Sequence, residues 1–265
     1  MSWGFRLFGV PLQVGAPFLI VIVLLGAGRG SDPLLLATWV AIAFVSVVLH
    51  ELGHAFTGRA FGMSPRIELG ALGGLTHFPG GPKVSPRRSI LVSLAGPAVS
   101  LTIGAIVLGV CALTSLPPSR ILATVVDDLV TVNIVWGIFN LLPILPLDGG
   151  NALRSTLSTL RTRKPELVAR VVSLVMIGVL VTLNVVLRWS LWNLLLVVGL
   201  AFTNIQGLRK LLAADDPPGP VAVESSSSPL RSLYLRAKLL YLRRGGRGTR
   251  IDLGDVEAPK KPKSK

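Results

Sequence analysis

The chain has 265 residues, of which 51% are hydrophobic and 15% are charged, and its formal net charge is +14. Soluble domains carry about 25% charged residues, so this composition and the mean hydropathy of +0.65 indicate an integral membrane protein. Much of the basic charge follows residue 208 and the rest flanks apolar segments, which argues against nucleic-acid binding. The lone cysteine, Cys111, excludes an intrachain disulfide and a cysteine metal site.

Apolar segments close to the ~20 residues that a helix needs to cross a membrane recur along the chain. They predict an all-α integral membrane protein with about six transmembrane helices. The first segment contains Pro11 and Pro17, so its helix is expected to begin near Ala16. Asparagines within the segments, such as Asn133 and Asn204, are expected to hydrogen-bond between helices. The six segments are 10–25, 34–56, 90–113, 122–142, 168–187 and 191–208.

The second apolar segment ends in VVLHELGHAF, which contains His50, Glu51 and His54. Residues four apart on a helix share one face, with Cβ atoms about 6 Å apart. Two imidazoles so placed can bind one Zn²⁺, and the intervening glutamate can act on a water bound to the metal. Charged groups at membrane depth cost roughly 2.5–3.5 kcal/mol each, which favours a functional role for them.

A glycine-containing loop joins the second and third predicted helices. Its run IELGALGGLTHF includes Gly70, Gly73 and Gly74, which disfavour a helix and predict a short β or re-entrant element. The loop also carries His77, a candidate third metal ligand. The competing candidate is Asp148, which follows two prolines and precedes two glycines, a sequence that stops or unwinds a helix. A carboxylate on a broken helix end at membrane depth favours Asp148 over His77 as the ligand.

Basic residues predict the orientation and the domain boundaries. Most loop arginines and lysines lie between the second and third helices and between the fourth and fifth, whereas the other loops carry only Arg29, Arg120 and Arg188. By the positive-inside rule, both termini are expected in the cytoplasm of a cell-membrane protein. We expect a membrane domain at 1–212, a flexible linker at 213–229 and a basic cytoplasmic tail at 230–265. Part of the tail has the pattern of an amphipathic helix, lying on an anionic leaflet or on the protein's own cytoplasmic face.

Three motifs together resemble the site-2 protease family of intramembrane zinc metalloproteases. They are HELGH at 50–54, AGP at 95–97 and NLLPILPLDGG at 140–150, and the resemblance covers about residues 5–208. It implies one Zn²⁺ per chain, with Glu51 as the catalytic carboxylate and Asn140 placing the substrate or stabilising the oxyanion. The metal ligands that it implies are His50, His54 and Asp148. Asn151 stands where the family commonly has a basic residue, a departure that touches no ligand.

The resemblance also implies hydrolysis of peptide bonds within or near transmembrane segments of membrane-protein substrates, in contact with the lipid bilayer. A substrate helix must unwind locally before its peptide bonds can be attacked. The loop at 66–82 is expected to pair with an extended substrate, to plug the active site, or to do both. Two other functions stay open: a zinc or ion transporter, which would not need Glu51, and a membrane-embedded zinc protease acting on soluble peptides at the cytoplasmic face.

Overall fold

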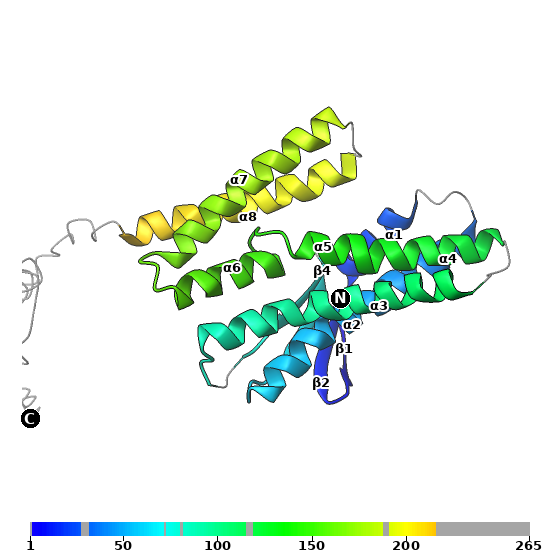
Figure 1. Ribbon diagram of the computed structural model, residues 1–265, viewed down its shortest axis with the longest axis horizontal. Helices are drawn as coiled ribbons and strands as arrows, with labels where there is room; N and C mark the ends of the chain where they lie inside the picture. The colour runs from blue at the N-terminus through cyan, green and yellow to red at the C-terminus, as the bar shows by residue number, and fades with distance from the viewer. Residues whose placement is uncertain are drawn as a thin grey trace, which may run out of the picture. The chain divides into compact units, whose positions relative to one another are not determined.

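The structure, a computed structural model, describes residues 2–27, 32–71, 73–79, 82–114, 119–187 and 191–215. Apolar helices and a small four-stranded sheet make up this part of the chain (Figure 1). The last described helix continues to Asp215, which is three residues past the predicted end of the membrane domain. The rest of the predicted linker and the whole basic tail lie outside the described residues.

Four helices in the described part of the chain are long and apolar enough to cross a membrane. They coincide with the second to fifth predicted segments. They are α2 (Pro33–Ala60), α3 (Pro86–Leu113), the continuous run Arg120–Asn140 and α7 (Pro165–Val186). The run Arg120–Asn140 comprises α4 (Arg120–Val130), a π-helical turn η2 (Thr131–Val135) and α5 (Trp136–Asn140). The sixth predicted segment forms part of α8 (Leu191–Asp215), which lies beside α7 (Figure 1).

The first predicted segment differs from the expectation. Its helix α1 (Ala16–Gly26) begins at Ala16 as predicted, but the residues before it form strand β2 (Val10–Gly15), which pairs with β1 (Ser2–Leu7). The physical reason is a period of two, in which Val10, Leu12 and Val14 are buried and the residues between them are not. The prediction of an all-α protein is therefore wrong at the N-terminus. Because α1 has 11 residues, it rises about 16 Å, roughly half of a hydrocarbon core.

The β element predicted between the second and third helices is a hairpin of β3 (Arg66–Gly70) and β4 (Gly73–His77). It joins the N-terminal hairpin in one sheet with the order β1-β2-β3-β4, because β2 and β3 pair in parallel. The residues of β2 and β3 that face inward pack on α1 and α2 in one apolar core. This core includes Leu12, Val14, Phe18, Ala43, Leu52, Ile67 and Leu69. The sheet therefore lies against the helix that carries the HELGH motif, with β4 at its edge.

Helices α2 and α3 approach each other closely at glycines. A Cβ on Gly53 would lie 2.8 Å from the carbonyl oxygen of Ala95, so no larger residue fits there without a shift. The run Arg120–Asn140 is tied to α2 by Asn133, whose Nδ2 donates to Ser46 Oγ at 3.0 Å. This bond between helices confirms the expectation for Asn133.

The loop at 141–147 is held by the C-terminal helix pair. Asn204 of α8 donates from Nδ2 to the carbonyl oxygen of Leu145 at 2.5 Å and to that of Leu200 at 2.8 Å. Ile144 of the same loop is buried in a second apolar cluster with Ile177, Val197 and Leu200. Asn204 thus joins its helix to a loop, where the sequence predicted a bond between helices. These contacts fix the start of the next helix, α6 (Asp148–Thr159).

Candidate metal centre

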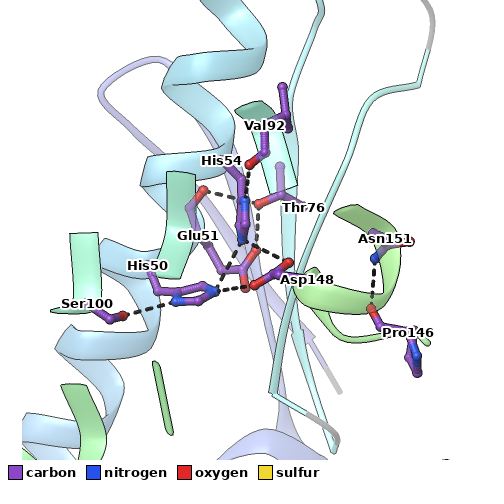
Figure 2. Close-up of polar contacts among 9 residues, drawn as sticks. All are labelled: His50, Glu51, His54, Thr76, Val92, Ser100, Pro146, Asp148 and Asn151. Atoms are coloured by element: carbon purple, nitrogen blue, oxygen red, sulfur yellow. Dashed lines mark hydrogen bonds and ion pairs between the residues drawn. The ribbon is translucent and has the colours of Figure 1, made fainter. Parts of the chain in front are cut away.

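Two histidines and one aspartate from distant parts of the chain meet where α2, α3 and α6 pack together (Figure 2). His50 Nε2 lies 3.2 Å from His54 Nε2 and 3.0 Å from Asp148 Oδ2. His54 Nε2 lies 3.3 Å from Asp148 Oδ1. One ligand atom of each residue lies within 4.8 Å of the other two. The structure therefore brings together the three residues that the sequence predicted as metal ligands.

The outer nitrogen of each imidazole has a partner on α3 (Figure 2). His54 Nδ1 lies 2.6 Å from the carbonyl oxygen of Val92. A carbonyl only accepts, so Nδ1–H donates and the lone pair is left on Nε2. His50 Nδ1 lies 3.0 Å from Ser100 Oγ, and donation to this hydroxyl leaves the His50 Nε2 lone pair free as well. Such partners fix the ring orientation and tautomer of histidines that bind metals.

Asp148 is positioned by a helix start. The sequence predicted a stop or an unwinding around this residue; helix α5 does end at Asn140, but Asp148 is the first residue of α6. A carboxylate is favoured there because the helix dipole is positive at its N-terminus. Asn151 donates from Nδ2 to the carbonyl oxygen of Pro146 at 2.8 Å (Figure 2), which closes the turn that presents Asp148.

The donor set fits zinc. Tetrahedral zinc with bonds of about 2.0–2.2 Å sets its ligand atoms about 3.3–3.6 Å apart. The two imidazole nitrogens lie close to this range at 3.2 Å, with one carboxylate oxygen of Asp148 3.0 Å from His50 Nε2 and the other 3.3 Å from His54 Nε2. Two imidazoles and a carboxylate are a common ligand set of catalytic zinc and leave a fourth position for water or substrate. Gly96 of α3 leaves room beside the two imidazoles, because a Cβ there would lie 2.7 Å from His50 Nε2 and closer still to His54 Nε2.

Glu51 lies beside this cluster and is covered by β4. Its side chain is buried, with the residue 5% exposed, and the hydroxyl of Thr76 donates to its Oε2 at 2.6 Å (Figure 2). The same hydroxyl lies 3.2 Å from the main-chain oxygen of Glu51. The structure thus places the predicted catalytic carboxylate next to the predicted metal ligands, as neighbours on one helix.

Two other candidates from the sequence lie elsewhere. His77 contacts Glu68 of β3, with Nε2 and Oε1 3.4 Å apart, and takes no part in the cluster. Asn140 is the last residue of α5 and is half-buried. Among the described residues its side chain forms no hydrogen bond with the cluster. Its predicted role stays a prediction.

Three residues of the site were not predicted from the sequence: Ser100, Thr76 and Gly96. In the sequence, Gly96 belongs to the AGP motif, and both Gly96 and Ser100 are small residues that allow close helix approach; no local pattern distinguishes Thr76. Ser100 lies one turn of α3 beyond Gly96, on the same face as the glycine. This spacing is a signal that could have placed Ser100 near the histidines.

The comparisons with known proteins decide the family. Residues 118–183, which include Asn140 and Asp148, match the model of peptidase family M50. The Rip2 protein of Mycobacterium tuberculosis is 32% identical over 189 residues, covering 60% of this chain and 71% of Rip2. The chain belongs to peptidase family M50. The site-2 protease family that the three motifs predicted is thereby confirmed.

Other M50 similarities extend over different parts of the chain. Zinc metalloprotease MJ0392 of Methanocaldococcus jannaschii is 31% identical over 163 residues, covering 60% of this chain and 47% of that protein. Rip3 of Mycobacterium tuberculosis is 38% identical over 151 residues, covering 56% of this chain and 35% of Rip3. The solved structure of the site-2 protease from Methanocaldococcus jannaschii aligns with a TM-score of 0.56 at 25% identity, covering 79% of this chain and 96% of that one. The M50 chain thus spans about half of MJ0392 and about a third of Rip3.

Proposed function

We propose that this M50 protein is a zinc metalloendopeptidase that hydrolyses peptide bonds within or near transmembrane segments of membrane proteins. The observation that carries the proposal is the position of Glu51 beside the cluster of His50, His54 and Asp148, on a helix long and apolar enough to cross a membrane. We propose one Zn²⁺ per chain, held by these two histidines and the aspartate.

Zinc held by these residues would act as a Lewis acid and would lower the pKa of water at the site. Glu51 takes the proton of the attacking water as general base and passes it to the nitrogen of the leaving amine, so that the C–N bond breaks without an unstable anion leaving. Oε1 is the oxygen proposed to move the proton, because the hydroxyl of Thr76 already occupies one acceptor site of Oε2. Asn140 is proposed to donate from its amide to the scissile carbonyl oxygen or to the substrate main chain.

The substrate is proposed to bind as an extended segment at the edge of β4. Among the described residues this strand pairs only with β3, so its outer hydrogen-bonding edge is proposed to accept a further strand. Pairing there would place an unwound substrate next to Glu51, because β4 covers this residue. An intact substrate helix would shield its peptide bonds by its own hydrogen bonds, so local unwinding comes first.

The protein is proposed to cross the cell membrane six times, with both termini in the cytoplasm. The four long apolar helices, together with α8 and the distribution of loop arginines and lysines, support this arrangement. Helix α1 rises only about 16 Å, so the first crossing requires that apolar residues of β2 also lie within the membrane.

The proposal is tested by incubating a model single-span substrate with purified wild-type protein and Glu51→Gln in detergent, with zinc measured on both. We expect cleavage within the span by the wild type alone, at equal zinc content. Asp32→Asn is the matched control, because this exposed carboxylate only caps the start of α2, accepting from the Leu34 N–H, and asparagine keeps the cap. Its cleavage rate should equal that of the wild type.

The same experiment separates the alternative functions. Zinc binding without cleavage by the wild type would favour a transporter, which needs metal ligands and has no use for a general base. Cleavage confined to residues outside the span would favour a protease of soluble peptides at the cytoplasmic face. Undiminished cleavage by Glu51→Gln would remove the role of general base from Glu51.

A further inference from the structure

Alternate residues of β4 face the helix that carries the HELGH motif. In the sheet, Thr76 pairs with Ile67 and Gly74 pairs with Leu69, and residues directly opposite on neighbouring strands point to the same face. Ile67 and Leu69 are buried in the core against α1 and α2. Thr76 and Gly74 therefore point toward α2, whereas Leu75 between them points away and is 59% exposed.

Both inward-facing residues of β4 contact Glu51. The Thr76 hydroxyl lies 2.6 Å from Oε2 and 3.2 Å from the main-chain oxygen of Glu51. A Cβ added to Gly74 would collide with Oε1 and would lie 2.6 Å from the Cδ of the same carboxyl group. Strand β4 therefore donates a hydrogen bond to Oε2 of Glu51 through Thr76. It leaves room beside Oε1 because Gly74 has no side chain.

We propose that β4 positions the catalytic base, with Thr76 as the positioning residue that fixes Oε2 of Glu51 and Gly74 as the residue that leaves space for Oε1. This inference rests on the proposed function and names an additional requirement of the same site. A glutamate side chain has several rotatable bonds, and a base must lie within hydrogen-bond reach of the proton that it takes. The Thr76 hydroxyl removes this freedom by fixing Oε2, and the absence of a side chain on Gly74 leaves room beside Oε1.

The arrangement couples the sheet to the chemistry. The strand proposed to receive the substrate also holds the base, so a substrate segment paired with the outer edge of β4 orders Thr76 and Glu51 together. A mobile β4 would leave the metal ligands in place, since His50 and His54 take their orienting partners from α3. We therefore expect loss of the Thr76 hydroxyl to affect turnover and to leave zinc binding unchanged.

The test compares Thr76→Val, which keeps the shape of the side chain without the hydroxyl, with Thr76→Ser, which keeps the hydroxyl. Thr102→Val is the matched control, because Thr102 is exposed on α3 and its hydroxyl donates to the carbonyl of Ala98 in the same helix. For Thr76→Val we expect kcat to fall about 10- to 100-fold, the range for a misplaced catalytic group, with zinc content unchanged and KM changed less than kcat. Thr76→Ser should restore kcat, and Thr102→Val should match the wild type.

A second readout needs no substrate. Hydrogen–deuterium exchange of the peptide that contains β4 should be about 3- to 10-fold faster in Thr76→Val, the change expected from one lost hydrogen bond. Wild-type exchange together with wild-type kcat in Thr76→Val would overturn the proposal. So would a change confined to KM, or a Thr76→Ser protein that binds zinc and stays as slow as Thr76→Val. If the zinc-loaded wild type cleaves nothing, the proposed function fails, whereas exchange still decides whether Thr76 anchors β4 to Glu51.

Discussion

Gly96→Ala is expected to abolish tight zinc binding by this protein. The substitution adds one methyl group to α3, at the point where that helix faces both imidazoles. The new Cβ would lie 2.7 Å from His50 Nε2 and closer still to His54 Nε2. The change leaves every proposed ligand, the proposed base and the turn that presents Asp148 intact, so it tests the geometry of the site alone.

The magnitude follows from how far the rings must move. Non-bonded heavy atoms separate to about 3.5 Å, so His50 Nε2 would have to retreat by about 0.8 Å. Zinc sites hold their bond lengths to within about 0.2 Å. The rings cannot yield easily, because Ser100 and Val92 hold their outer nitrogens. Loss of one orienting partner lowers metal affinity about 10- to 100-fold. Displacement of two ligands is therefore expected to lower the zinc affinity at least about 100-fold, which corresponds to about 2.8 kcal/mol.

The assay is competition for zinc between a chromogenic chelator and the purified protein in detergent. Gly109→Ala is the matched control, because Gly109 lies on the same helix and a Cβ there would meet nothing within 4 Å. Alanine favours a helix over glycine by about 1 kcal/mol, so this control should fold and bind zinc normally. If Gly96→Ala binds zinc within about threefold of the wild type, the assignment of the space between the imidazoles to the metal is refuted.

Three further predictions concern the partners of the site and of the helices. Asp148→Ala is expected to weaken zinc binding at least about 100-fold in the same competition assay, and full zinc occupancy would contradict the ligand role. Ser100→Ala removes the 3.0 Å contact of His50 Nδ1 and should lower zinc affinity about 10- to 100-fold; unchanged affinity would show that the ring needs no such support. Asn133→Ala removes the 3.0 Å bond to Ser46 and should destabilise the protein by about 0.6–1.7 kcal/mol. That loss is measured as a lower denaturation midpoint in mixed micelles, and a wild-type midpoint would mean that the bond contributes nothing.

The parts of the fold that the sequence predicted are those set by local spacing. The α2 helix could be predicted because a long apolar segment leads directly into HELGH, and the interval of four residues fixes the geometry of the two histidines. The asparagine in the fourth segment could be expected to find a partner, since an amide in an apolar helix needs one, and Asn133 does bond to Ser46. Asp148 could be predicted as a ligand because a carboxylate on a broken helix end at membrane depth is costly unless it binds a partner.

The parts that the sequence did not predict depend on contacts between distant segments. In the sequence, the apolar residues of β2 are continuous with those of α1, so β2 resembles part of a helix. The pairing of β2 with β3 joins residues more than 50 positions apart, which local spacing does not reveal. Thr76 is one threonine among many until β3 and β4 are placed against α2. Ser100 likewise becomes a partner of His50 only once α2 and α3 are packed. Spacing along the chain predicts neighbours on one helix but does not identify a partner on another element.

The parallel pairing of β2 with β3 connects residues 2–15 to the proposed chemistry of Glu51. A two-stranded hairpin is marginally stable by itself, and β3 and β4 have five residues each. The hairpin of β1 and β2 extends this pair to a four-stranded sheet. The stability of that sheet is expected to set how firmly Thr76 is held in its hydrogen bond with the Glu51 carboxylate. In the proposed mechanism, residues 2–15 support a reaction that takes place on a different element, α2. Substitutions in these residues are expected to slow turnover, although they remove no group that contacts the substrate or the metal.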